Sequence, residues 1–205
     1  MIASSIRLAI FSVVFLFTTG CALTKDYVSL QYVPDPSPTR VEGAEKAQVT
    51  VSTVDSRTVK DRVSSKKNGY GMEMAAIIAT NDVPTLFQQA LETELEHMGF
   101  KKGPGANLIC DVTKFYNDFK VGFWSGDAAA DVMINLQVKD SQGQLLYAKS
   151  FSAEGRKENI QLASGNNAKV ALEAGLAEVV RKAVRDPELS AALMKAGGSA
   201  TVSLR

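Results

Sequence analysis

The side chains that most often carry out chemistry are scarce in this 205-residue chain, which has one histidine and two cysteines. His97 stands near the end of a predicted helix, where a lone histidine complements the helix dipole. As a catalytic base it would need an oriented nucleophile, and the sequence proposes none. Cys110 alternates with apolar neighbours, which predicts a small buried hydrophobe. A reactive thiol or an intermolecular disulfide is the alternative for this cysteine.

Four aspartates lie near one another, and paired carboxylates can perform acid–base chemistry or bind Ca²⁺. They are Asp111, Asp118, Asp127 and Asp131. Their spacing matches no calcium-binding loop, so solvated turn residues are the simpler interpretation. The chain also lacks a Gly-x-Ser-x-Gly motif and a glycine-rich phosphate loop. We therefore expect no enzymatic activity, no cofactor and no metal site.

The other cysteine, Cys21, has distinctive surroundings. Arg7 is followed by a nearly uninterrupted apolar run at residues 8–17. That run is much shorter than the roughly 20 residues that span a bilayer as a helix, and it is typical of a secretory signal. Small residues at 18–20 then directly precede Cys21. The pattern predicts a signal peptide over residues 1–20; a plain secreted protein and a single-pass anchor are the alternatives.

This segment resembles a bacterial lipoprotein signal with its lipobox. In that motif the cysteine thiol becomes diacylglyceryl-modified, and cleavage exposes an amine that takes a third acyl chain. By this resemblance Cys21 is the lipidation site, and several acyl chains hold a protein stably on a membrane. Ala22, where an Asp would favour the inner membrane, implies the outer membrane, with the domain expected to face the periplasm.

The rest of the chain divides into three predicted parts. Residues 21–46 contain Pro34, Pro36 and Pro38, which favour an extended tether with a span of about 28 Å. Residues 47–196 form one domain, and residues 197–205 form a frayed tail. The alternative for the tether is that its apolar side chains pack along the domain; these are Tyr27, Val28, Leu30, Tyr32 and Val33.

Hydrophobic periodicity predicts the elements of the domain. The pattern indicates an α+β fold in the order β-α-β-β-β-α, with an antiparallel sheet of about four strands and two amphipathic helices packed on one face. Turns are expected at residues 68–71 and 141–144. The predicted elements are strands at 47–54, 108–116, 132–138 and 145–153, helices between Asp82 and Gly99 and from about residue 166 to Asp186, a short helix to about Lys195, and a strand or ledge at 75–79.

Two segments are candidate binding surfaces. The connection around residues 117–129 carries Phe119, Phe123 and Trp124, and exposed aromatics are typical anchors for a partner. Alternatively, they extend a long hairpin and pack on the core. The second segment has a net charge of +4, which could attract an anionic glycolipid or peptidoglycan, or could simply be a solvated loop. Its cations are Arg57, Lys60, Arg62, Lys66 and Lys67, against one acid, Asp61.

Several short motifs occur in a fixed order after the lipobox cysteine. They are Asp55-Ser56-Arg57, Gly99-Phe100, Phe115-Tyr116-Asn117-Asp118 and Ala130-Asp131-Val132. Together they resemble the YajG-type family of Gram-negative envelope lipoproteins over most of residues 21–185. The resemblance implies a compartment and a fold, but no reaction.

The expected function is an outer-membrane lipoprotein with a non-enzymatic periplasmic binding or assembly domain. The alternative is an accessory module that binds an anionic glycolipid or peptidoglycan. We expect a membrane and an envelope partner, and no nucleic acid, because the net charge of +1 lacks a basic footprint.

Overall fold

The computed structural model of the chain describes residues 23–120, 122 and 125–198. Three α-helices are present in this part, α3 (Val83–Met98), α4 (Gly165–Val184) and α5 (Pro187–Gly198), together with a 3-10 turn, η1 (Ala44–Lys46). The strands are β1 (Asp26–Val28), β2 (Gln48–Asp55), β3 (Ser64–Lys67), β4 (Glu73–Ala79), β5 (Lys101–Lys102), β6 (Ala106–Lys120), β7 (Gly126–Lys139) and β8 (Leu145–Ile160).

The strands form one mixed sheet of eight members. β6, β7 and β8 are long and antiparallel, as predicted. The other edge of β6 pairs in parallel with β2 along its first half and with β3 at Asn117. β4 then pairs with β3 antiparallel, and β1 pairs with β4 in parallel. The predicted α+β class is confirmed, but the predicted antiparallel sheet of about four strands has too few strands and misses the parallel pairings.

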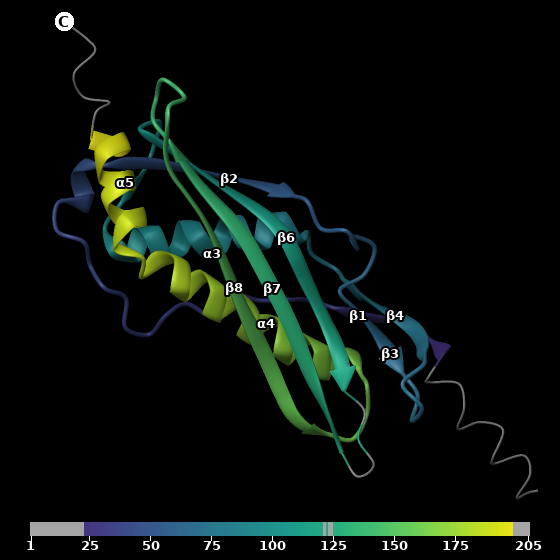
Figure 1. Cartoon of the computed structure of the whole chain (residues 1–205). Coiled ribbons are helices and arrows are strands. Elements are labelled where there is room, and N and C mark those ends of the chain that lie inside the picture. Colours follow the sequence, from purple (N-terminus) through teal and green to yellow (C-terminus); the bar gives the residue numbers. More distant parts are fainter. Residues whose placement is uncertain (1–22, 121, 123–124, 199–205) are drawn as a thin grey trace, which may run out of the picture.

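Helices α3 and α4 lie side by side on one face of this sheet (Figure 1), as predicted. α4 packs mainly on β7 and β8, and α3 packs on β2. Phe87 of α3 meets Phe115 of β6 edge to face, with ring centroids 5.4 Å apart. A β-carbon on Gly155 would lie 2.0 Å from the carbonyl oxygen of Ala171, so the backbones of β8 and α4 touch there. The core therefore lies between the helices and the long strands.

Local signals explain the bounds of α3. Asp82 caps its first turn by accepting a hydrogen bond from the backbone N–H of Thr85. Pro84 also lies in the first turn, where the backbone N–H that proline lacks would have no partner within the helix. Gly99 ends the helix with a φ of 105°, a left-handed conformation that glycine adopts without a steric cost. Both ends agree with the predicted helix between Asp82 and Gly99.

The segment before the domain is not a detached tether over its described part. β1 pairs with β4, Leu30 is buried, and the hydroxyl of Tyr32 donates to Glu94 at 2.6 Å. Further along, the backbone N–H of Val41 donates to the carbonyl of Met98. The alternative of packing along the domain therefore describes most of this segment. Tyr27 and Val33, which that alternative also included, are exposed.

Two other segments extend beyond their predicted bounds. Residues 64–79 form the β3–β4 hairpin, and the strand considered for residues 75–79 is the second half of β4. At the other terminus α5 continues to Gly198, and Gly197 is buried because its backbone packs against Ala47 and Gln48. Residues 197 and 198 therefore belong to α5 and not to the expected frayed tail.

Candidate functional site

The predicted lipidation site, Cys21, lies outside the described residues, but the chain after it limits its distance from the fold. Four residues separate it from Asp26, so five extended steps reach at most about 17 Å. Asp26 is held in place, because its carboxylate accepts a hydrogen bond from Gly165 N–H at 2.8 Å and pairs with Lys66 Nζ at 2.7 Å. Burial alone would raise the pKa of Asp26, but these partners hold it below its ordinary value.

Three of the five predicted anion-binding cations line one polar pocket of about 270 Å³. Arg57, Lys60 and Arg62 lie in the connection from β2 to β3, and the turn into α3 closes the other side. Arg57 is 6% exposed and donates from Nε and Nη2 to the Asp55 carboxylate at 2.8 and 2.9 Å. These bonds lower the pKa of Asp55. Lys60 Nζ donates to the Asp55 carbonyl at 2.6 Å.

The remaining cations lie elsewhere and are also paired. Lys66 and Lys67 belong to β3, where Lys66 contacts Asp26 and Lys67 Nζ donates to Asp118. Arg62 lies within 3.8 Å of both Asp61 and Glu73. Acidic partners therefore compensate the net charge of +4 that the segment has by itself. Arg57 and Lys66 are buried and so are not part of a solvated loop, and anion binding by the segment stays a prediction.

The predicted aromatic surface is only partly described. Phe119 is 2% exposed and faces the core from β6, so it follows the alternative of a long hairpin. Phe123 and Trp124 lie outside the described residues, and their partner-binding role stays a prediction.

The structure places the potentially reactive side chains in different surroundings. Cys110 is fully buried, and burial raises the pKa of its thiol to about 12, so the nucleophilic thiolate is absent at neutral pH. His97 is exposed in the last turn of α3. Asp131 pairs with Lys114 at 2.7 Å, and Asp127 accepts the Asn159 N–H. Among the residues that the structure describes, no three His, Cys, Asp or Glu side chains are grouped to hold a metal ion.

The structure buries one carboxylate that the sequence patterns did not single out. Glu94 is 1% exposed and accepts hydrogen bonds from the Tyr32 hydroxyl and from the Asp35 N–H at 3.0 Å. Burial and the Glu94 charge raise the pKa of Tyr32. Its position in the sequence could have predicted this burial, because Glu94 stands three residues after Leu91 and four before Met98, on the apolar face of α3.

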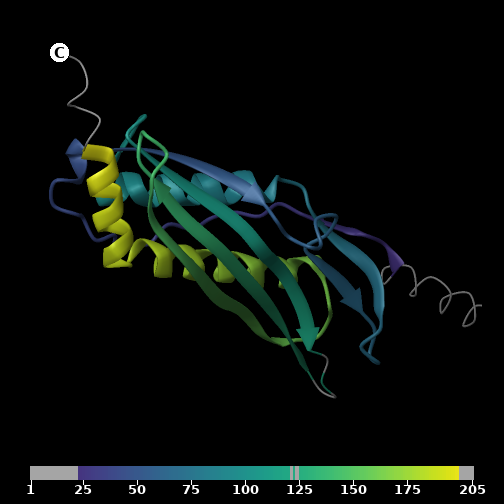
Figure 2. The same cartoon turned by 45° about the horizontal axis from the view of Figure 1, so that its top comes forward.

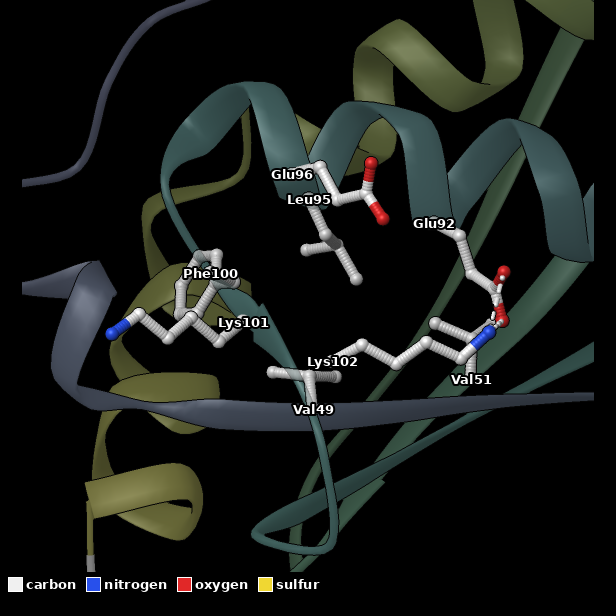
Figure 3. A pocket seen from close by; sticks show the side chains of 8 residues that line it. All are labelled: Val49, Val51, Glu92, Leu95, Glu96, Phe100, Lys101 and Lys102. Atoms are coloured by element: carbon white, nitrogen blue, oxygen red, sulfur yellow. Dashed lines mark hydrogen bonds and ion pairs between the residues drawn. The ribbon is translucent and has the colours of Figure 1, made fainter.

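A shallow groove lies between α3 and β2, where Figure 3 shows Val49, Val51 and Leu95 below and beside the helix. Lys102 Nζ crosses its opening and contacts Glu92 at 3.1 Å. The enclosed space is about 10 Å³, far below the roughly 300–1,000 Å³ of small-molecule pockets. The groove is therefore no small-molecule site.

The adjacent strand β2 has an unpaired stretch of edge. The Ser56 N–H donates to β6, and the Val49 carbonyl accepts from Gly103 on the opposite side. Backbone groups alternate in direction along a parallel pair, so those of Val51 and Thr53 point away from β6. β5 pairs only with Gln48 and Val49. Within the described chain, no strand pairs with this edge at Val51 or Thr53.

None of the helices in the described ranges is long and apolar enough to cross a membrane. No curated protein matches the chain. Among solved structures, it resembles a DUF330-family protein from Xanthomonas campestris at 15% identity, with a TM-score of 0.54, over 87% of this chain and 100% of that one. A minor lipoprotein from Acinetobacter baumannii is similar at 11% identity and a TM-score of 0.38, over 51% of this chain and 84% of that one.

The first of these likenesses shows the DUF330-like fold alone, and the second score is too low to support an argument. The family comparison reaches further, because a family model described as "Uncharacterized lipoprotein" matches residues 34–194, which include α3, α4, most of α5 and, in the described part of the chain, every strand after β1. The chain therefore belongs to this uncharacterized lipoprotein family.

Proposed function

We propose that the protein is an outer-membrane lipoprotein of the YajG type, anchored through acylated Cys21, whose periplasmic domain binds a protein partner without catalysis. One observation carries the proposed anchor. The chain belongs to a lipoprotein family, and its Cys21 stands five residues before β1. Ala22 at the sorting position supports the outer membrane.

Fractionation of cells tests the anchor. Cys21→Ala is expected to move the protein from the membrane pellet to the released fraction, because the acyl chains are its stable attachment. Ala22→Asp is the matched sorting variant, and it is expected to shift the protein to the inner membrane with its acylation intact. A Cys21→Ala protein that stays in the membrane pellet contradicts the proposed anchor.

The edge of β2 is the proposed partner surface. An extended segment of a partner can add to a sheet edge, with backbone hydrogen bonds supplying affinity and side-chain pockets supplying specificity. Val51 and Thr53 offer the backbone groups, and the groove beside Leu95 offers an apolar pocket. The Lys102 side chain, which pairs with Glu92 across the groove, is 65% exposed. Breaking this exposed ion pair therefore costs little free energy.

Crosslinking in cells tests this surface. A photo-crosslinking residue at Glu96, on the rim of the groove, is expected to capture an envelope protein, and the same residue at Gln142 is the control. Thr53→Pro removes an N–H that points away from β6, so the fold should persist while the crosslink is lost. A crosslink at Glu96 that survives Thr53→Pro contradicts strand addition.

The polar pocket supports a second candidate, an accessory module that binds an anionic glycolipid or peptidoglycan. The supporting observation is that Arg57, Lys60 and Arg62 converge on one space of about 270 Å³. Titration with inorganic phosphate tests it, and Lys60→Gln is expected to weaken binding that Lys67→Gln, outside the pocket, leaves unchanged. If titration of the wild-type protein with phosphate shows no heat of binding, this candidate is rejected.

A further inference from the structure

Several exposed large apolar side chains lie at one end of the domain. The tip of the β3–β4 hairpin carries Tyr70, which is 91% exposed, and Met72, and Met74 follows on β4. Leu23 and Leu162 are also exposed, at 64% and 73%. Large exposed apolar patches usually mark a contact surface.

The topology places these side chains at the end where the chain to Cys21 departs. β1 pairs in parallel with β4, with Asp26 opposite Ile77. The Gly165 N–H donates to Asp26, which brings the β8–α4 connection with Leu162 to the same place. Figures 1 and 2 show the start of β1, the β3–β4 hairpin and that connection together at one end, with α5 and the β7–β8 turn at the other.

The reach of the hairpin equals the reach of the anchor chain. Cys21 precedes Asp26 by five residues, and Met72 precedes the paired Ile77 by the same number. At roughly 3.3 Å per residue, each run reaches at most about 17 Å when fully extended. A bilayer that holds the acyl chains at Cys21 therefore lies within the reach of Tyr70 and Met72.

The backbone of the tip is suited to an environment poorer in water. The Asn68 carboxamide oxygen accepts the N–H groups of both Tyr70 and Met72 at 3.0 Å. The Gly71 N–H donates to the Asn68 carbonyl at 2.9 Å. These bonds reduce the cost of leaving bulk water, because unsatisfied backbone groups are what a bilayer penalises. Residues 68–72 also carry no charge.

We propose that the tip of the β3–β4 hairpin, residues 68–72, inserts into the headgroup region of the bilayer beside the acyl chains, so that the domain stands on the membrane at two points. Tyr70 supplies an amphipathic ring of the kind enriched at membrane interfaces, and Met72 supplies an adaptable apolar chain. This inference rests on the proposed acylation of Cys21, which delivers the tip to the bilayer. The hairpin then fixes the orientation of the domain.

Fluorescence quenching in proteoliposomes tests this contact. The full acylated protein, with Tyr70→Cys carrying an environment-sensitive dye, is reconstituted into vesicles of phosphatidylethanolamine and phosphatidylglycerol that contain a headgroup-level quencher. Labelling is selective because Cys110 is buried and Cys21 is acylated. Gln142→Cys, in the turn at the opposite end, is the matched control. We expect quenching at position 70 to exceed that at position 142 about twofold or more.

A second label separates insertion from mere proximity. A dye on Leu162→Cys should also be quenched, and Tyr70→Gln with Met72→Gln should reduce that quenching about twofold because the end is held less closely. Protein that floats with the vesicles while positions 70 and 142 are quenched equally overturns this inference and leaves the anchor intact. Protein that does not float with the vesicles overturns the anchor and this inference together.

Discussion

The turns at residues 68–72 and 140–144 share one backbone architecture at opposite ends of the domain. In each, the first residue accepts two backbone N–H groups on its side-chain oxygen, from the residues two and four positions later. In each, the fourth residue is a glycine with a φ near 80°, Gly71 at 79° and Gly143 at 84°. In each, the N–H of the first residue donates to the carbonyl of the fifth, and the glycine N–H donates to the carbonyl of the first.

The two turns differ in the side chains that this shared backbone presents. The first has Tyr70 and Met72 where the second has Gln142 and Gln144. Hydrogen bonds and glycine conformation therefore set the shape of each turn. The side chains of its third and fifth residues do not set that shape, so they can match the environment around the turn. One turn lies beside the departure of the anchor chain, and the other lies at the far end (Figures 1 and 2).

The largest expected effect tests the rigid frame that keeps these ends apart. Gly155→Ala would place a β-carbon 2.0 Å from the Ala171 carbonyl oxygen and 2.2 Å from the Gly175 nitrogen, both backbone atoms that cannot swing aside. We expect β8 and α4 to separate at a cost of about 3 kcal/mol or more, measured by chemical denaturation.

Gly198→Ala is the matched control, because a β-carbon there meets nothing within 4 Å. We expect no measurable loss of stability from it. A Gly155→Ala protein as stable as this control would show that β8 and α4 can shift apart, and the two ends would then not be held at a fixed separation.

Much of this frame could be predicted from the sequence because its contacts are local. The alternation of buried and exposed residues in β6, β7 and β8 depends on neighbouring residues. The caps of α3 at Asp82 and Gly99 do so as well. Both turns were predicted from their glycines and polar residues. The parallel pairs of β1 with β4 and of β2 with β6 could not be derived this way, because each joins segments about 50 residues apart.

The strand β3 was missed for a different reason. Its sequence, Ser64-Ser-Lys-Lys67, has no apolar residue, yet its first three residues are buried. Polar partners compensate that burial, since Ser64 donates to the Asn117 carbonyl at 2.8 Å and Lys66 pairs with Asp26. Local propensity contains no sign of such partners. The place of the tip beside the anchor chain depends on β3, so it too was beyond local patterns.

The next effect should be the same at both ends. Gly71→Ala and Gly143→Ala each force a β-carbon into the left-handed region, and we expect each to cost about 1–2 kcal/mol of unfolding free energy. Gly69→Ala, in the first turn but without a positive φ and with nothing within 4 Å of its β-carbon, should be neutral. Costs that differ widely between Gly71→Ala and Gly143→Ala would contradict the shared architecture.

Acid should weaken both ends through two carboxylates. The pKa of Asp26, at the anchor end, lies below its ordinary value through Lys66 and Gly165. Burial would raise the pKa of Asp186, at the other end, but Lys149 and the Tyr147 hydroxyl outweigh burial and lower it. A depressed folded pKa contributes stability above the unfolded pKa of roughly 3.9, and that stability is lost as the pH falls through the folded value.

Denaturation across pH measures this contribution. At neutral pH, Asp26→Asn and Asp186→Asn should each cost about 1 kcal/mol, through weakened charge-assisted hydrogen bonds. The difference from the wild-type chain should shrink once the pH falls below the folded pKa, where the native carboxylate is protonated as well. A constant difference down to strongly acidic pH would mean that the ionised form contributes nothing.

The smallest effect on stability is expected where the two turns differ. Tyr70→Gln with Met72→Gln gives the first turn the two glutamines of the second and keeps Asn68, Gly71 and every backbone bond. Both replaced side chains are exposed, so the unfolding free energy should change by less than about 0.5 kcal/mol. Denaturation of the released, non-acylated Cys21→Ala protein with and without the exchange measures this without a membrane. A large loss would mean that Tyr70 and Met72 stabilise the fold itself, and their exposure at the anchor end would then need no bilayer to explain it.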